Sequence, residues 1–228
     1  MKLEKVVPWG RLASEYERMF SLTSEDRAKR IVDCGGGPSS FTAEMTAQGY
    51  SVLSCDPIYQ FSQEAIRERI EETCTRMTAM NEETKAQFRW DHYGSPVQLS
   101  QIRMRAMRLF LEDYPVGRAQ GRYIIGELPL LPFPSAHFDL ALCSHFLFTY
   151  SEQFTMEFHL QSLREMARVA HEVRVFPILM AFSGEISPHL APVVAQLQND
   201  HYQVEVRKVD YEFQIGGNEM LVIRHKSV

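Results

Sequence analysis

Three consecutive glycines and a later aspartate form the pattern in this sequence with the clearest chemistry. Gly35, Gly36 and Gly37 follow the strand-like run 30–34, and Asp56 lies 21 positions beyond Gly35. Because glycine has no Cβ, such a turn lets a ligand approach the backbone closely. A carboxylate at the end of the next strand can accept hydrogen bonds from both hydroxyls of a ribose. Together, the turn and the carboxylate indicate a cofactor of the adenosine type.

The surrounding residues predict the elements that would position this pair. The run 30–34 reads as a strand that ends at the glycines, a helical segment follows as far as Gly49, and 50–55 is a second strand that ends at Asp56. This order of strand, helix and strand makes a right-handed parallel unit. The glycine turn and Asp56 are therefore expected at the same carboxyl edge of one sheet.

Later segments continue the alternation of strands and helices. Strands are predicted at 121–126, 137–143 and 172–176, and helices at 152–169 and 188–198. In the tail, the alternation over 204–213 changes phase, which indicates a bulge near 207–208, and the glycines at 216–217 turn the chain into the apolar run 220–223. We therefore predict an α/β fold with a mostly parallel sheet and an antiparallel C-terminal hairpin, in a single domain over residues 1–228.

The segment 57–120, between the second and third strands, is too long for a simple connection and has helical patterns of its own. We expect it to form a helical cap inserted in the domain. The stretch 95–122, which includes its second half, carries the arginines Arg103, Arg105, Arg108, Arg118 and Arg122. These side chains suit a carboxylate or phosphate group, and a solvated helix face explains them as well. Trp90, His92 and Tyr93 are equally ambiguous as walls of an aromatic pocket.

Composition limits the partners and the location of the protein. The 24 Lys and Arg residues against 29 Asp and Glu residues leave a formal charge of −5, which argues against nucleic acid as a partner. Cys34, Cys55, Cys74 and Cys143 have neither metal-site nor disulfide spacing, so we predict reduced thiols and no metal. There is no run of eighteen apolar residues, and the first residues lack the features of a secretion signal. We expect a cytoplasmic protein with no membrane partner, and the oligomeric state stays open.

The order of these motifs resembles that of class I S-adenosylmethionine-dependent methyltransferases. Residues 33–39, Asp-Cys-Gly-Gly-Gly-Pro-Ser, match the family's first motif, and 126–133 resembles its adenine-binding loop before the fourth strand at 137–143. Ser39 replaces the last glycine of the first motif, and Glu127 takes the place of an Asp. The resemblance covers residues 28–226 and implies a Rossmann-like sheet that binds S-adenosyl-L-methionine.

The resemblance also implies a role for each motif residue. Gly35, Gly36 and Gly37 would contact the methionine part of the cofactor, Asp33 its amino group, Asp56 the ribose, Glu127 and Leu128 the adenine, and Ser144 with His145 the methionine part again. The N-terminal segment with Trp9, Arg11 and Tyr16 resembles the lid helix that packs over the cofactor in many members. The alternative for this segment is a helix that docks an apolar stripe onto the sheet.

Methyl transfer from a sulfonium depends mainly on aligning the acceptor with an already activated methyl group. An amine or hydroxyl acceptor must also lose a proton, and His145, in the loop after the fourth strand, is the candidate base. Tyr150, in the same loop, is a candidate for positioning the acceptor. The other roles open to His145 are bonding the cofactor and capping the next helix.

The expected function is S-adenosylmethionine-dependent methyl transfer to a small molecule. Residues 143–146, Cys-Ser-His-Phe, lack the Pro-Pro-Tyr or Pro-Pro-Phe motif of enzymes that methylate amino groups of nucleic acids, and no cysteine follows a proline as the cytosine carbon type requires. Methylation of a macromolecule, RNA or protein, is the alternative. Another is a module that binds the cofactor without catalysis. Ser40, where a dinucleotide fold has its third glycine, argues against a nicotinamide-dependent oxidoreductase.

Overall fold

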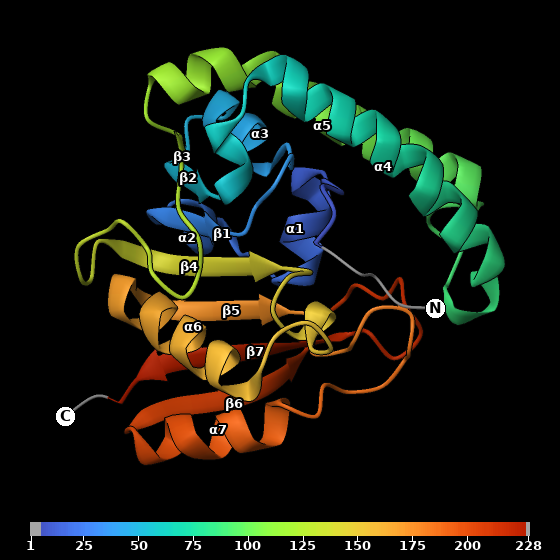
Figure 1. Ribbon diagram of the computed structural model, residues 1–228. Helices are drawn as coiled ribbons and strands as arrows, with labels where there is room; N and C mark the ends of the chain where they lie inside the picture. The colour runs from blue at the N-terminus through green and yellow to red at the C-terminus, as the bar shows by residue number, and fades with distance from the viewer. Residues whose placement is uncertain (1–5, 227–228) are drawn as a thin grey trace.

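The computed structural model describes residues 6–226, so residues 1–5 and 227–228 of the predicted domain lie outside the described part. Its strands are β1 (Ile31–Cys34), β2 (Val52–Cys55), β3 (Tyr123–Ile124), β4 (Phe138–Ser144), β5 (Ala170–Phe176), β6 (Tyr202–Lys208) and β7 (Glu219–His225). They form one seven-stranded sheet in the order β3-β2-β1-β4-β5-β7-β6 (Figure 1). The first five strands are parallel, and β7 lies antiparallel between β5 and β6. The predicted fold class is confirmed.

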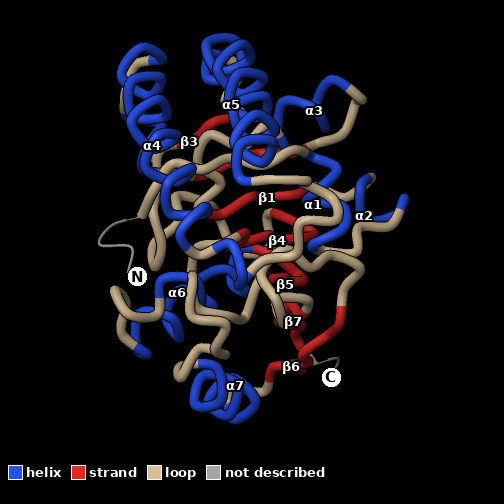
Figure 2. Tube along the Cα trace, turned by 90° about the vertical axis from the view of Figure 1, so that its right-hand side faces the viewer, coloured by secondary structure: helices blue, strands red, loops and turns tan. Residues whose placement is uncertain are grey.

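Helices cover both faces of the sheet. They are α1 (Ala13–Met19), α2 (Ser24–Arg27), α3 (Phe41–Ala47), α4 (Gln63–Glu83), α5 (Pro96–Ala119), α6 (Met156–Val169) and α7 (Leu190–Asn199), with the short 3-10 turns η1 (Pro57–Gln60), η2 (Lys85–Gln87) and η3 (Phe148–Tyr150). Figure 2 shows α6 and α7 on one side of the strands and α1 and α3 on the other. Each side has its own buried apolar cluster. None of the helices in residues 6–226 combines the length and the apolar character needed to cross a membrane.

Helices α4 and α5 form an antiparallel pair that extends beyond the sheet on the side of its carboxyl edge (Figure 1). A hydrogen bond of 2.5 Å between the Thr78 and Ser100 hydroxyls joins the two helices. The loop 209–218, which joins β6 to β7, contacts the connection between α4 and α5, where Arg89 N donates to Phe213 O at 2.7 Å. The pair therefore spans the carboxyl ends of the strands from β3 to the C-terminal hairpin.

The C-terminal hairpin corrects one prediction. Strands β6 and β7 pair residue for residue, from Tyr202 opposite His225 to Lys208 opposite Glu219, so the predicted bulge near 207–208 is wrong. The change of phase marks the end of β6 instead, where the loop 209–218 begins. Tyr211 in this loop is buried. The apolar residues that alternate beyond Lys208 therefore belong to a loop that packs over the edge of the sheet.

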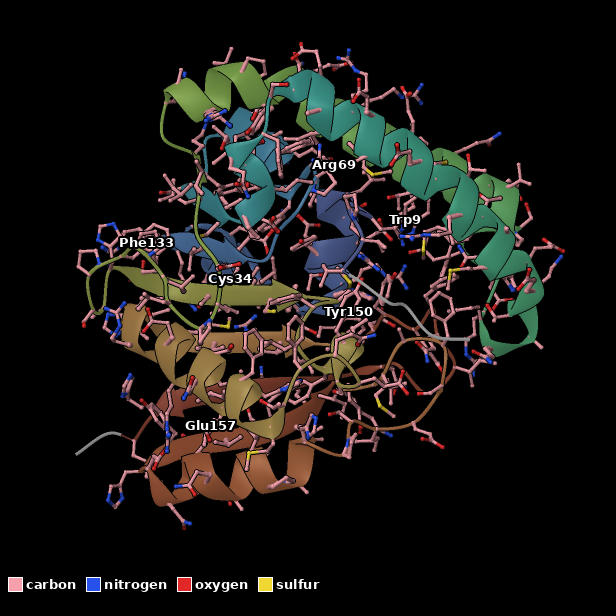
Figure 3. All side chains as sticks on the ribbon, viewed as in Figure 1. Trp9, Cys34, Arg69, Phe133, Tyr150 and Glu157 are labelled. Carbon is pink, nitrogen blue, oxygen red and sulfur yellow. The ribbon has the colours of Figure 1, made fainter. Side chains whose placement is uncertain are left out.

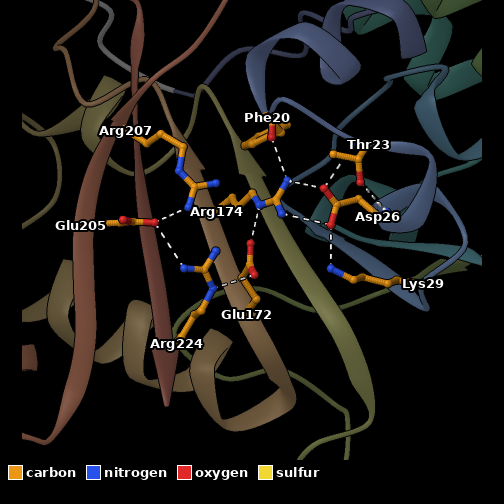
Figure 4. Close-up of polar contacts among 9 residues, drawn as sticks. All are labelled: Phe20, Thr23, Asp26, Lys29, Glu172, Arg174, Glu205, Arg207 and Arg224. Carbon is orange, nitrogen blue, oxygen red and sulfur yellow. Dashed lines mark hydrogen bonds and ion pairs between the residues drawn. The ribbon is translucent and has the colours of Figure 1, made fainter. Parts of the chain in front are cut away.

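A buried ion network joins the N-terminal segment to the antiparallel strands (Figure 4). The Arg174 guanidinium on β5 donates to both carboxylate oxygens of Asp26, at 3.0 and 3.1 Å, and to the carbonyl of Phe20 at 2.8 Å. It also donates to Glu172 at 2.5 Å, whose other oxygen accepts from Arg224 on β7 at 2.8 Å. Because these partners come from distant parts of the chain, the network holds α1 and α2 against the sheet.

Candidate functional site

A cavity of about 670 Å³ lies at the carboxyl edge of the sheet. Figure 3 labels three residues of its wall: Arg69 on α4, Trp9 in the N-terminal segment and Tyr150 after β4. Of the predicted site residues, those that line it are Trp9, Arg11, Tyr16, Gly35, Gly36, Gly37, Asp56, Glu127, Leu128, Ser144, His145 and Tyr150. The remaining one, Asp33, lies directly below the glycine turn. The fold thus brings residues from separate loops to one place.

The glycine turn forms one end of the cavity, and its shape requires glycine. Gly35 and Gly37 have φ values of +72° and +54°, in the left-handed region that disfavours other residues. A Cβ on Gly36 would lie 2.2 Å from Ser54 Oγ and 2.4 Å from Asp33 Oδ2. The backbone therefore rests directly on the side chains below it and leaves the space above for a ligand.

Asp33 carries an unused hydrogen-bond acceptor beneath this turn. Its Oδ2 accepts from the Tyr16 hydroxyl at 3.0 Å, while its buried Oδ1 has no hydrogen-bond partner in residues 6–226. Burial raises the pKa of Asp33 to about 7, against the lowering effect of the Tyr16 bond. A cationic donor at this position would satisfy Oδ1 and favour the ionised carboxylate. The amino group of a methionine moiety fits that requirement.

Asp56 faces the other side of the turn. Its Oδ2 accepts from Gly37 N at 2.9 Å, and its Oδ1 accepts from Ile58 N at 2.7 Å. Burial raises the pKa of Asp56 to about 6, despite these two backbone bonds. Each carboxylate oxygen has more than one acceptor position, so Asp56 keeps the capacity to accept from two ribose hydroxyls.

The loop after β3 supplies an apolar wall next to Asp56. Leu128 is buried, whereas Glu127 is exposed at the rim. Cys55 and Cys143 lie close to this wall in the sheet core, and burial raises the pKa of each thiol to about 12, so both stay protonated. Within the described part of the chain, no group of three or more His, Cys, Asp or Glu side chains could hold a metal ion. An apolar wall of this kind suits a planar ring.

His145 lies where β4 ends and has a positive φ of 49°. Its backbone N–H donates to Phe176 O at 2.6 Å, and its Nδ1 lies 3.1 Å from Ser144 Oγ. Burial, together with the positive charges of Arg11 and Arg103, lowers the pKa of His145 well below its usual value. The imidazole is therefore neutral and disposed to hydrogen bonding rather than to holding a proton.

The N-terminal segment runs from the loop after β4 to the glycine turn. The Tyr150 hydroxyl accepts from Val7 N at 3.1 Å, which ties the segment to that loop. Farther along, Tyr16 stacks on Phe41 with ring centroids 4.4 Å apart, so α1 docks on the sheet face. Residues 9 and 11 lie between these anchors and line the cavity.

Sequence reasoning missed a polar cluster behind the cavity wall. Arg103 Nη1 donates to Glu15 Oε2 at 2.5 Å, and the Tyr93 hydroxyl donates to Glu15 Oε1 at 2.5 Å and lies 2.8 Å from the Tyr211 hydroxyl. In the sequence, Arg103 and Tyr93 carry only ambiguous signals, and Tyr211 lies in the alternating run 204–213, which does not indicate a polar partner. For Glu15, the one local signal is its position beside the apolar stripe of α1, which does not indicate its partners.

Comparisons with known proteins agree with this architecture. No protein-family model matches the sequence. The uncharacterized protein MJ0045 of Methanocaldococcus jannaschii is 33% identical over 225 residues, which is 98% of each chain. The structure of the mitomycin 7-O-methyltransferase MmcR superposes with a TM-score of 0.51 at 13% identity, over 94% of this chain and 54% of that one. The magnesium protoporphyrin IX methyltransferase ChlM of Synechocystis PCC 6803 gives a TM-score of 0.47 at 10% identity, over 93% and 78% of the two chains. The identity to MJ0045 shows that the chain belongs to the protein family of MJ0045, and the superposition on MmcR shows the class I S-adenosylmethionine-dependent methyltransferase fold.

Proposed function

We propose that the protein transfers a methyl group from S-adenosyl-L-methionine to a small-molecule acceptor. One observation carries this proposal: the glycine turn and the carboxylate of Asp56 meet at one end of a single cavity, and the unsatisfied oxygen of Asp33 lies directly below that turn. The turn suits a close-lying amino-acid chain, Asp33 an ammonium group and Asp56 the hydroxyls of a ribose. S-adenosyl-L-methionine contains all three.

Each side chain then has a defined task at the cofactor. Asp33 and the glycine turn would hold the methionine part, Asp56 the ribose, and Leu128 the adenine ring, with Glu127 at the rim near its amino group. Ser144 would contact the methionine part, and Trp9, Arg11 and Tyr16 would cover it. When bound, the cofactor supplies a methyl group activated by a positively charged sulfur.

The acceptor side of the cavity needs to exclude water and to orient the acceptor. Tyr150 offers a hydroxyl hydrogen there, because its oxygen accepts from Val7 N and no residue in 6–226 accepts its own proton. The lowered pKa of His145 favours orienting the acceptor through a hydrogen bond over acting as a strong general base. The α4–α5 pair acts as the cap.

The size and cover of the cavity favour a small acceptor over RNA or protein. A volume of about 670 Å³ falls within the range of roughly 300–1,000 Å³ usual for small-molecule sites. Helix α4, helix α5 and the N-terminal segment all contribute to its wall. The formal charge of −5 also opposes a phosphate backbone.

Calorimetry tests the cofactor assignment directly. We expect S-adenosylmethionine and S-adenosylhomocysteine to bind, NAD not to bind, and Asp56→Asn to weaken binding at least about tenfold, because hydrogen bonds to a charged group contribute about 1.5–3 kcal/mol each. Asp139→Asn is the matched control, since Asp139 pairs with Arg30 at the opposite edge of the sheet. Wild-type protein that binds neither sulfur nucleoside, or Asp56→Asn protein that binds both as well as wild type, would contradict the assignment.

A further inference from the structure

The acceptor side of the cavity is lined by a set of phenylalanines. This aromatic wall consists of Phe88, Phe146, Phe154, Phe158, Phe182 and Phe213. Phe88 stacks on Phe213 with centroids 4.6 Å apart, and Phe154 stacks on Phe158 at 4.3 Å. The two stacks come from different parts of the chain and enclose an apolar space. A planar, apolar body would bury its faces between such rings.

Arg103 introduces a buried positive charge beside this wall. It is 1% exposed and lines the cavity, and its Nε has no hydrogen-bond partner within the described part of the chain. Its Nη1 is bonded to Glu15. Tyr93, which donates to the same carboxylate, packs edge-on against Phe213 at 4.9 Å. The guanidinium therefore adjoins the aromatic wall through its own partners.

The charges at this end of the cavity do not balance. Burial opposes ionisation of Glu15, but the charge and hydrogen bond of Arg103 lower its pKa, so this carboxylate is ionised. Glu15 neutralises Arg103 and leaves a second arginine, Arg11, without a counterpart. Arg11 also lines the cavity, and burial together with the nearby charge of Arg103 lowers its pKa. The Nε of Arg11 is likewise buried and lacks a partner in residues 6–226. Buried charges and donors need a counterpart.

Asp56 and Glu127 line the cavity and Asp33 lies nearby, but these three acids do not supply that counterpart. Asp33 lies under the glycine turn, Asp56 is bonded to Gly37 N, and Glu127 is exposed at the rim. Arg69, on α4, adds a further positive charge to the wall and stacks over Phe61 at 3.9 Å. One anionic group from a ligand would reduce this excess of positive charge and satisfy the free Nε of Arg103.

We propose that the methyl acceptor is an aromatic carboxylate, with its carboxylate bound by Arg103 and its ring system held by the aromatic wall. A carboxylate is planar and presents two oxygens, which matches the fork of a guanidinium edge. Asn81 on α4 is 2% exposed, lines the same cavity and has an Nδ2 without a partner among the described residues, so it offers the ligand another donor. This assignment rests on the proposed function, of which it names the substrate class.

The test uses matched pairs of neutral and anionic probes. A hydroxynaphthoate and a hydroxybenzoate, each with its primary amide, are titrated by calorimetry into protein saturated with S-adenosylhomocysteine. We expect at least one carboxylate to bind ten times more tightly than its amide, and this preference to disappear in Glu15→Gln/Arg103→Gln, which removes both members of the ion pair. Arg105→Gln, on an exposed residue of the same helix, is the control and keeps the preference.

Three results would overturn the inference. The first is wild-type protein that binds no carboxylate more tightly than its amide. The second is a carboxylate preference that survives in Glu15→Gln/Arg103→Gln. The third is that this double variant binds S-adenosylhomocysteine ten times more weakly but binds methylthioadenosine as tightly as the wild type. The last would assign Arg103 to the carboxylate of the cofactor and leave the proposed function intact. If the double variant does not fold, Arg103→Lys retains the Glu15 pair and is expected to reduce the preference severalfold, because lysine lacks the fork.

Repeating the titrations without S-adenosylhomocysteine separates the two proposals. Carboxylate binding that depends on Arg103 in a protein that binds neither sulfur nucleoside would support the carboxylate subsite and refute methyl transfer. Cofactor binding with no carboxylate preference would support the proposed function and refute the carboxylate subsite.

Discussion

Acidification from about pH 7.5 to about pH 5.5 is expected to weaken the binding of S-adenosylhomocysteine on the order of 100-fold. Asp33 and Asp56 are buried carboxyl groups whose pKa values in the structure are about 7 and about 6. The ammonium and the ribose hydroxyls of the ligand would bind the ionised forms. Binding therefore releases protons, and affinity rises with pH.

The magnitude follows from the fraction of each group that must lose a proton. With a pKa of about 7, protonation of Asp33 weakens binding roughly 25-fold between the two pH values, if the bound carboxylate stays ionised throughout. With a pKa of about 6, Asp56 contributes a further factor of roughly four. The product, on the order of 100, corresponds to about 2.7 kcal/mol of binding free energy.

Calorimetry at both pH values, with ligands that differ in one group, separates the two carboxylates. Methylthioadenosine lacks the amino acid, so its affinity is expected to fall only about fourfold, the factor assigned to Asp56. Asp33→Asn is expected to show the same small dependence with S-adenosylhomocysteine. An affinity that is constant or rises on acidification, or an equal loss for both ligands, would refute the assignment of Asp33 to the ammonium group.

Three further predictions concern the turn and the stability of the fold. Gly36→Ala is expected to abolish nucleoside binding, because its Cβ would lie 2.2 Å from a buried hydroxyl. Gly121→Ala has a positive φ but no described atom within 4 Å of its Cβ, so it is expected to keep binding and to lose about 1 kcal/mol of stability. Calorimetry measures the binding of both variants, and denaturant unfolding measures their stability. Arg174→Met is expected to lower the free energy of unfolding by about 3 kcal/mol, since the buried carboxylates of Asp26 and Glu172 each lose one of two cationic partners, and the more exposed Arg207→Met by less than about 1 kcal/mol. The hydrogen bonds from Arg174, Lys29 and Thr23 hold the pKa of Asp26 well below its usual range. The ionised Asp26 therefore stabilises the fold above about pH 4, and this stabilisation is lost as the pH falls further. In acid unfolding followed by circular dichroism, the stability of Arg174→Met is expected to depend less on pH than that of the wild type.

The strands and the glycine turn could be predicted because their signals act between chain neighbours. An apolar run, a glycine at positive φ and an acid after a strand each report on local backbone geometry. The same reasoning failed at 209–213, where alternating apolar residues belong to a loop. Val209 N donates to Asn218 O at 2.9 Å and closes the loop there, a contact that no local pattern indicates.

The order of motifs along the chain was enough to predict the parallel sheet, the carboxyl edge that holds the turn, and Asp56 beside it. The acceptor side depended on packing between distant segments. Glu15, Tyr93, Arg103 and Tyr211 meet in one hydrogen-bonded cluster although Glu15 and Tyr211 are 196 positions apart. Their juxtaposition arises because α5 crosses the sheet edge and the loop 209–218 closes against it. Periodicity shows which face of an element is buried, and only the packed fold shows which buried groups share a partner.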